Sequence, residues 1–210
     1  MIAQAGHCAR GGGGGVTGGV GTLPWRGPPR GRADLMALAR PATHVLLGLI
    51  LVAYGCLVIS FINNDFSLLN VASHSNSHLP LMYRIAASWG SHEGSLLLWL
   101  LMQAGWAWAV ATFSKNLPLP VLSRILAVMG LLTLSFLLFV LFTSNPFDRL
   151  LPVPADGRDL NPLLQDPGMI FHPPMLYMGY VGMSVAFAFA MAALIGGNLD
   201  AQWARWSRPW

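Results

Sequence analysis

VLSRILAVMGLLTLSFLLFVLF, residues 121–142, decides the fold class of this chain. A helix needs about 20 mostly apolar residues to cross the hydrocarbon core of a bilayer, and Arg124 is the only Asp, Glu, Lys or Arg in the stretch. Residues 44–62, 94–113 and 174–196 form three further apolar stretches of similar length that contain none of these four residue types. We therefore predict an all-α, polytopic transmembrane helix bundle with about four spans.

The composition agrees with a membrane protein. Of the 210 residues, 54% are hydrophobic and only 10% are charged, whereas soluble domains carry about 25% charged residues. Cys8 and Cys56 are too few for a disulfide framework, and the chain has no Cys-x-x-Cys-His, so it is not itself a c-type cytochrome. Its arginines cluster beside the apolar stretches, which is typical of membrane orientation and argues against nucleic-acid binding.

The distribution of Lys and Arg predicts the orientation. Cytoplasmic segments carry the excess of these residues. One side holds nine of them: Arg10, Arg26, Arg30, Arg32, Arg40, Lys115, Arg124, Arg205 and Arg208. The other side, loops 63–93 and 143–173, holds Arg84, Arg149 and Arg158. We therefore expect the bundle, 44–196, to place both long loops outside and residues 197–210 in the cytoplasm.

The first 43 residues differ in composition from the rest. Residues 11–21 are nearly all glycine, and 24–32 are rich in proline, glycine and arginine. We expect that such a segment cannot form a helix or a core, and it lacks the apolar region of a signal peptide. We predict that residues 1–43 are disordered and cytoplasmic.

His172, in Phe171-His172-Pro173-Pro174, is the strongest candidate for chemistry. A proline disfavours helical backbone in the preceding residue, and Pro174 suits the first turn of the fourth span. We expect His172 to lie just outside that span, where a neutral imidazole can ligate a metal. The alternative is a loop histidine that hydrogen-bonds a carbonyl.

Other polar residues near or within the second span have structural and functional interpretations. In the structural interpretation, Ser91 or Ser95 caps the helix, and the negative charge of Glu93 is favourable near the helix N-terminus. In the functional interpretation, His92 and Glu93 handle protons or support a bound cofactor. Gln103 is expected to form an interhelical hydrogen bond. Trp99, Gln103 and Trp106 share one helix face, which is a packing surface or a cofactor site.

Four motifs, at residues 89–99, 141–147, 157–168 and 171–182, resemble the CcmF/NrfE family of cytochrome c haem lyase subunits, and the resemblance extends over about residues 32–210. It implies a multi-pass protein of the bacterial inner membrane, with loops 63–93 and 143–173 in the periplasm. It also implies haem handling during haem attachment to apocytochrome c, with a CcmE-type haem chaperone and CcmH/CcmI-type subunits as partners besides the membrane lipid.

The resemblance assigns His172 as an axial ligand to the iron of a transient b-type haem. His92 and Glu93 match a family motif, although no specific role follows for them. Arg149 and Arg158 pair with Asp148 and Asp159, or contact the haem carboxylates. No residue is assigned as catalytic, and the resemblance does not separate the CcmF type from the NrfE type.

Two departures from the family pattern affect the expected function. Family members begin with an apolar helix where this chain has residues 11–32, and a reading-frame error in a GC-rich gene would explain the glycines. The chain also stops before the family's tryptophan-rich loop and further haem ligands. We expect an N-terminal fragment that is inactive alone, so enzyme activity stays open. The alternatives are a transporter or channel fragment, or a non-functional remnant of a truncated gene.

Overall fold

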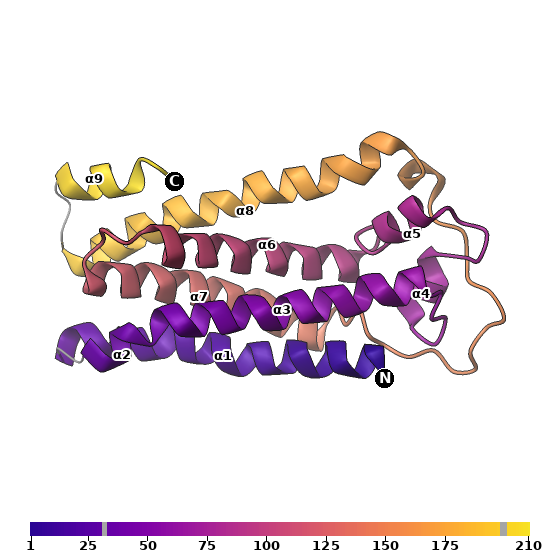
Figure 1. Cartoon of the computed structure of the whole chain (residues 1–210), viewed down its shortest axis with the longest axis horizontal. Helices are drawn as coiled ribbons and strands as arrows, with labels where there is room; N and C mark the ends of the chain where they lie inside the picture. The colour runs from indigo at the N-terminus through magenta and orange to yellow at the C-terminus, as the bar shows by residue number, and fades with distance from the viewer. Residues whose placement is uncertain (31–32, 198–200) are drawn as a thin grey trace.

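The computed structural model describes residues 1–30, 33–197 and 201–210, and it shows a bundle of long, roughly parallel or antiparallel helices (Figure 1). The five long helices are α1 (Ile2–Arg30), α3 (Ala39–Ile62), α6 (His92–Phe113), α7 (Leu119–Phe142) and α8 (Pro167–Gly196). The shorter helices are α2 (Ala33–Ala37), α4 (Leu69–His74), α5 (Leu81–Ala87), the 3-10 helix η1 (Pro162–Leu164) and α9 (Ala201–Ser207).

Four helices in the described part of the chain are long and apolar enough to cross a membrane: Ala33–Ile62, His92–Phe113, Leu119–Phe142 and Ile170–Gly196. They coincide with the four predicted spans, so the predicted fold class is confirmed. A short helix, α5, precedes Trp89 in the loop between the first two spans.

The two ends of the bundle differ in structure. The N-terminus, α4, α5, the start of α8 and the 143–166 loop lie at one end, which we call the loop end (Figure 1). The turn between α6 and α7 lies at the opposite end together with α2 and α9 (Figure 1). The predicted outer loops, 63–93 and 143–173, therefore lie on the same side of the bundle.

Helix α1 corrects the prediction of disorder over residues 1–43 as far as Arg30, and α2 and the start of α3 correct it from Ala33 onward; residues 31–32 lie outside the described residues. Helix α1 packs along α3 and α7, with a stripe of small residues turned inward at helical spacing: Ala3, Gly6, Ala9, Gly13 and Thr17. Each helical glycine costs about 1 kcal/mol relative to alanine, but small residues let two helix backbones approach closely. This packing is a tertiary effect that local propensity does not include.

Arg10 lies near the loop end, on the same side of the bundle as the predicted outer loops and not at the end that carries the other described basic residues of the N-terminal segment (Figure 1). Its side chain is buried, and its Nη1 donates to the Val140 carbonyl at 3.2 Å, in the last turn of α7 beside the loop end. The guanidinium carbon also lies 5.8 Å from the centre of the Phe147 ring, a cation–π contact. With Arg10 counted at the loop end, the expected cytoplasmic side has eight Lys and Arg residues in place of nine, and the other side has four in place of three. The expected orientation is therefore unchanged.

Candidate functional site

The backbone around His172 differs from the prediction. Helix α8 begins at Pro167, so His172, Pro173 and Pro174 all lie inside the helix. Asp166 provides the cap, because its Oδ1 accepts a hydrogen bond of 2.7 Å from the Gly168 N–H, and Pro167 occupies the first turn, where a missing N–H costs little. Because the helix begins earlier than predicted, His172 lies within the first turn of the fourth apolar helix, Ile170–Gly196.

His172 points away from the rest of the bundle. Its side chain is exposed, and it forms no hydrogen bond with any residue that the structure describes. Leu176 and Met183 lie on the same helix face and are 42% and 71% exposed, respectively. The opposite face carries the buried contacts, including Val181 and Val185. The imidazole is therefore available to a ligand on a face that the described residues leave uncovered.

His92 begins α6 at the same end of the bundle. Its Nδ1 lies 3.1 Å from the Ser144 hydroxyl oxygen, and its ring meets the edge of Phe139 at a centroid distance of 6.2 Å. Ser91 caps α6 by accepting a hydrogen bond of 3.0 Å from the Gly94 N–H, with Glu93 in the first turn. The capping interpretation of this motif is confirmed. Nε2 of His92 has no hydrogen-bond partner within the part of the chain that the structure describes.

Gly94 explains why this motif contains a glycine. A Cβ at this position would lie 1.8 Å from the Ser88 carbonyl oxygen, so only glycine permits the chain from α5 to approach the start of α6. The close approach also positions His92 beside α5 and α8.

A pocket of about 260 Å³ joins α5, α6, η1 and α8 at the loop end. Its lining residues include Trp89, His92, Leu164, Pro173 and Tyr177. Pro173 is the neighbour of His172 in the chain, so the fold brings the His92 motif and the His172 motif to the same pocket. Sequence reasoning missed Leu164, Tyr177 and Ser144, because their roles depend on contacts between distant segments.

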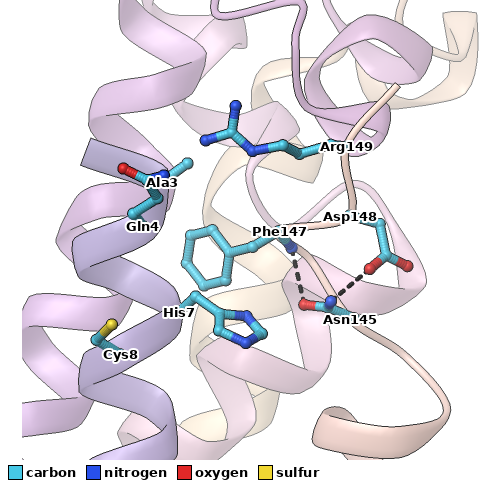
Figure 2. Close-up of a pocket in the computed structure, with 8 residues that line it drawn as sticks. All are labelled: Ala3, Gln4, His7, Cys8, Asn145, Phe147, Asp148 and Arg149. Atoms are coloured by element: carbon cyan, nitrogen blue, oxygen red, sulfur yellow. Dashed lines mark hydrogen bonds between the residues drawn. The ribbon is translucent and has the colours of Figure 1, made fainter. Parts of the chain in front are cut away.

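Arg149 and Arg158 lie elsewhere at the loop end. The side chain of Arg149 extends toward the first turn of α1 and lines a pocket of about 280 Å³ with His7 and Asp148 (Figure 2). The N–H of Arg158 donates to the Ala72 carbonyl at 2.8 Å. Neither arginine lines the pocket that holds His92 and Pro173.

The acidic neighbours of these arginines have other partners. Asp148 accepts a hydrogen bond from the Asn145 side chain, and Asp159 accepts one from Asn76. Among the described residues, no ion pair joins Arg149 to Asp148 or Arg158 to Asp159. The predicted pairs are therefore replaced by amide–carboxylate contacts.

The Trp99–Gln103–Trp106 face of α6 is a packing surface against α8. Trp99 lies between Phe136 and Tyr177, each at a ring-centroid distance of 5.6 Å. Gln103 Oε1 accepts a hydrogen bond of 2.9 Å from the Ser184 hydroxyl, as the interhelical interpretation predicts. Trp106 Nε1 donates to the Met178 carbonyl at 3.0 Å.

These features define a multi-pass membrane protein with two histidine-bearing helix ends on one side. The family model of the cytochrome C assembly proteins matches residues 89–210, so the chain belongs to that family, which agrees with the proposed resemblance and not with a transporter or channel.

Individual relatives agree with this family. The chain is 60% identical to the cytochrome c-type biogenesis protein CcmF of Pseudomonas aeruginosa over 190 residues, which are 90% of this chain and 29% of the relative. It is 57% identical to CcmF of Escherichia coli over 188 residues, 89% of this chain and 29% of that protein. Identity to the NrfE protein of Haemophilus influenzae is 46% over 176 residues, 84% of this chain and 28% of that protein.

A solved structure titled cytochrome c heme lyase CcmF resembles the fold with a TM-score of 0.86 and 25% identity. The likeness covers 100% of this chain and 33% of that one. The chain thus spans less than a third of the length of the curated relatives it matches.

Proposed function

We propose that this chain supplies one axial ligand, His172, to haem that is handled during cytochrome c maturation. The observation that carries the proposal is an imidazole without a hydrogen-bonding partner among the described residues, on an uncovered face at the outer end of an apolar helix. A neutral imidazole is a common axial ligand of haem iron. The haem would be b-type here, held by coordination and contacts alone.

The residues around His172 suit contact with one face of a haem. Leu176 and Met183 give the face apolar character and stay exposed, which suits the flat, apolar porphyrin. The packed opposite face of α8 and the Gln103–Ser184 hydrogen bond hold the helix in place. His172 would hold the iron, Leu176 would contact the ring, and the α6–α8 packing would fix the orientation of the imidazole.

His92 and Glu93 are supporting residues in this proposal. Ser144 contacts Nδ1 of His92, which leaves Nε2 available to a group that enters the pocket lined by His92 and Pro173. Arg149 and Arg158 are proposed as contacts to acidic groups of a partner at the loop end, since both are exposed. Their positions give no support to a contact with the carboxylates of a haem at His172.

The cellular setting follows from the Lys/Arg asymmetry and the family. We place the chain in the bacterial inner membrane, with the loop end in the periplasm. There it would receive haem from a CcmE-type chaperone and act with CcmH/CcmI-type subunits on apocytochrome c.

The haem site is divided in this proposal. The described residues offer one candidate axial ligand on an uncovered face, so the second ligand and the covering wall come from residues outside this chain. The 210-residue chain alone would then bind haem weakly and attach none.

Complementation of a strain that lacks its own CcmF-type protein tests this function, with haem-stained cytochrome c as the readout. The chain alone should give no cytochrome c. Co-expression with residues corresponding to the remainder of the Pseudomonas aeruginosa relative should restore it, and the intact relative is the positive control. Restoration by the chain alone would refute the divided site, and no restoration by the pair would refute the function.

A further inference from the structure

An apolar groove runs along the surface of the bundle between α3, α6 and α8. It encloses about 410 Å³, and its lining residues are apolar and include Leu47, Leu51, Gly105, Trp106, Trp108 and Met178. The groove lies within the apolar segments Ala33–Ile62 and His92–Phe113. Its α6 residues run from the middle of that helix toward the end away from the loop end, so the groove lies within the hydrocarbon part of a membrane.

The shape of the groove suits a single hydrocarbon chain. A Cβ at Gly105 would meet nothing within 4 Å, so the absent side chain leaves open space at the middle of the groove. The α6 residues that line it extend from Leu101 to Ala109, a length of roughly 12 Å at 1.5 Å per residue. This length is close to the acyl depth of one leaflet, which is half of the ~30 Å hydrocarbon core.

The end of the groove away from the loop end is polar and basic. His44 Nε2 lies 3.4 Å from the Thr112 hydroxyl oxygen, and the His44 ring meets the edge of Trp108 at 6.5 Å. One turn further along α3, Arg40 donates a hydrogen bond of 3.3 Å to the Ser114 carbonyl, and its buried Nε has no partner among the described residues. Lys115 follows Ser114 and is exposed.

We propose that this groove binds one anionic phospholipid, with an acyl chain along Gly105 and the phosphate at Arg40 and Lys115. The site combines an apolar channel, an aromatic ring at its mouth and a cluster of positive charge. Trp residues favour the level of the headgroups, and each Lys or Arg near the surface attracts anionic lipid. The proposal is independent of haem handling.

The test uses the purified full chain in detergent and measures retained lipid by native mass spectrometry, with phosphatidylglycerol and phosphatidylcholine as probes. Gly105→Leu fills the groove and should reduce phosphatidylglycerol retention about tenfold, by displacing two or so buried methylenes. Gly179→Leu is the matched control, because a Cβ there also meets nothing within 4 Å. It should retain lipid as the original chain does.

Two further variants test the positive charge at the basic end of the groove. Arg40→Gln and Lys115→Gln should each lower the preference for phosphatidylglycerol over phosphatidylcholine about fivefold. Arg124→Gln is the control, because α7 contributes no residue to the groove. An unchanged preference in both charge variants, or retention in Gly105→Leu equal to that in Gly179→Leu, would overturn the proposal.

A second measurement covers the case in which Gly105→Leu does not fold. Phosphatidylglycerol with brominated acyl chains should quench the fluorescence of the original chain, and Trp108→Phe should remove part of that quenching. Equal fractional quenching in the two chains would overturn the assigned position of the acyl chain.

Discussion

The Gln103 side chain accepts a hydrogen bond of 2.9 Å from the Ser184 hydroxyl, which joins α6 to α8 inside the apolar part of the bundle. Gln103 is only 2% exposed. This contact fixes the helix that carries His172, so the arrangement of the site depends on it.

Ser184→Ala should destabilise the bundle by about 0.6–2 kcal/mol, the range for interhelical hydrogen bonds in membrane proteins, because it leaves the Gln103 oxygen without its donor. Thermal unfolding of the chain in detergent, followed by circular dichroism, measures the change. Ser135→Ala is the control, because the Ser135 hydroxyl donates to Leu131 in its own helix and to no other helix that the structure describes. Equal stability of the two variants would contradict the role of the contact.

Gly6→Val should detach α1 from the bundle. A Cβ at Gly6 would lie 2.6 Å from the Phe147 ring and 2.9 Å from Cys56 Cβ, so the helix must move outward. In a Cys8→Ser background, the rate of maleimide labelling at Cys56 should rise several-fold. Gly11→Val is the control, because a Cβ there meets nothing within 4 Å, and it should leave the rate unchanged. Similar rates in both variants would argue against the docked α1.

The orientation has a direct test in reporter fusions. A reporter that is active only outside the cytoplasm should be active after Leu79 or Pro154, and silent after Asn116 or at the C-terminus. Cys8 is exposed near the loop end, so a membrane-impermeant maleimide added to the periplasm should label it. The opposite reporter pattern would place His172 on the wrong side for periplasmic haem.

Asp156 connects the two outer loops through a carboxylate. The Ser77 hydroxyl donates to it at 2.6 Å, the Ser77 N–H at 3.0 Å and the Gly157 N–H at 2.8 Å. These bonds lower the pKa of Asp156 below its ordinary value of 3.8. Because the folded pKa is the lower one, the contact stabilises the loops above the unfolded pKa and is lost as pH falls through the folded pKa.

Ser77→Ala should therefore raise the pKa of Asp156 toward 3.8, because it removes the largest cause of the shift while the backbone donors remain. Carboxyl carbon NMR titration of labelled aspartate measures it. A Ser67→Ala variant, whose hydroxyl contacts Asp65 instead, should leave the pKa of Asp156 unchanged. A pKa that is the same in Ser77→Ala and the original chain would contradict the contact.

The four spans were predictable from sequence, because apolar length in a bilayer is a local property and few other structures satisfy the backbone there. The Ser91 cap was predictable because capping is a local contact. Gln103 was expected to bond another helix because a polar side chain within a span needs a partner, but its partner, Ser184, lies far away in the chain. Helix α1 was not predicted, since glycine disfavours an isolated helix and only the contact with α3 and α7 offsets that cost. Small residues from Ala3 to Thr17 at helical spacing were the available signal.

The candidate site was predicted only in part. His172 and His92 were identified from their motifs, but the start of α8 at Pro167 was missed, because Pro174 indicated the first turn of the helix. One pocket joins segments that lie far apart in the chain, and it is lined by Trp89, His92, Pro173 and Tyr177. No local sequence pattern predicts such a contact.

His172 is the residue on which the proposed function depends most directly. The test joins residues 1–210 to the remainder of the Pseudomonas aeruginosa relative and compares His172→Gly with His74→Gly in a strain without its own CcmF-type protein. His172→Gly should abolish haem-stained cytochrome c, and added imidazole should restore part of it by replacing the missing ligand. His74→Gly should mature cytochrome c normally. Normal maturation in His172→Gly without imidazole would contradict the proposal that His172 ligates the haem iron.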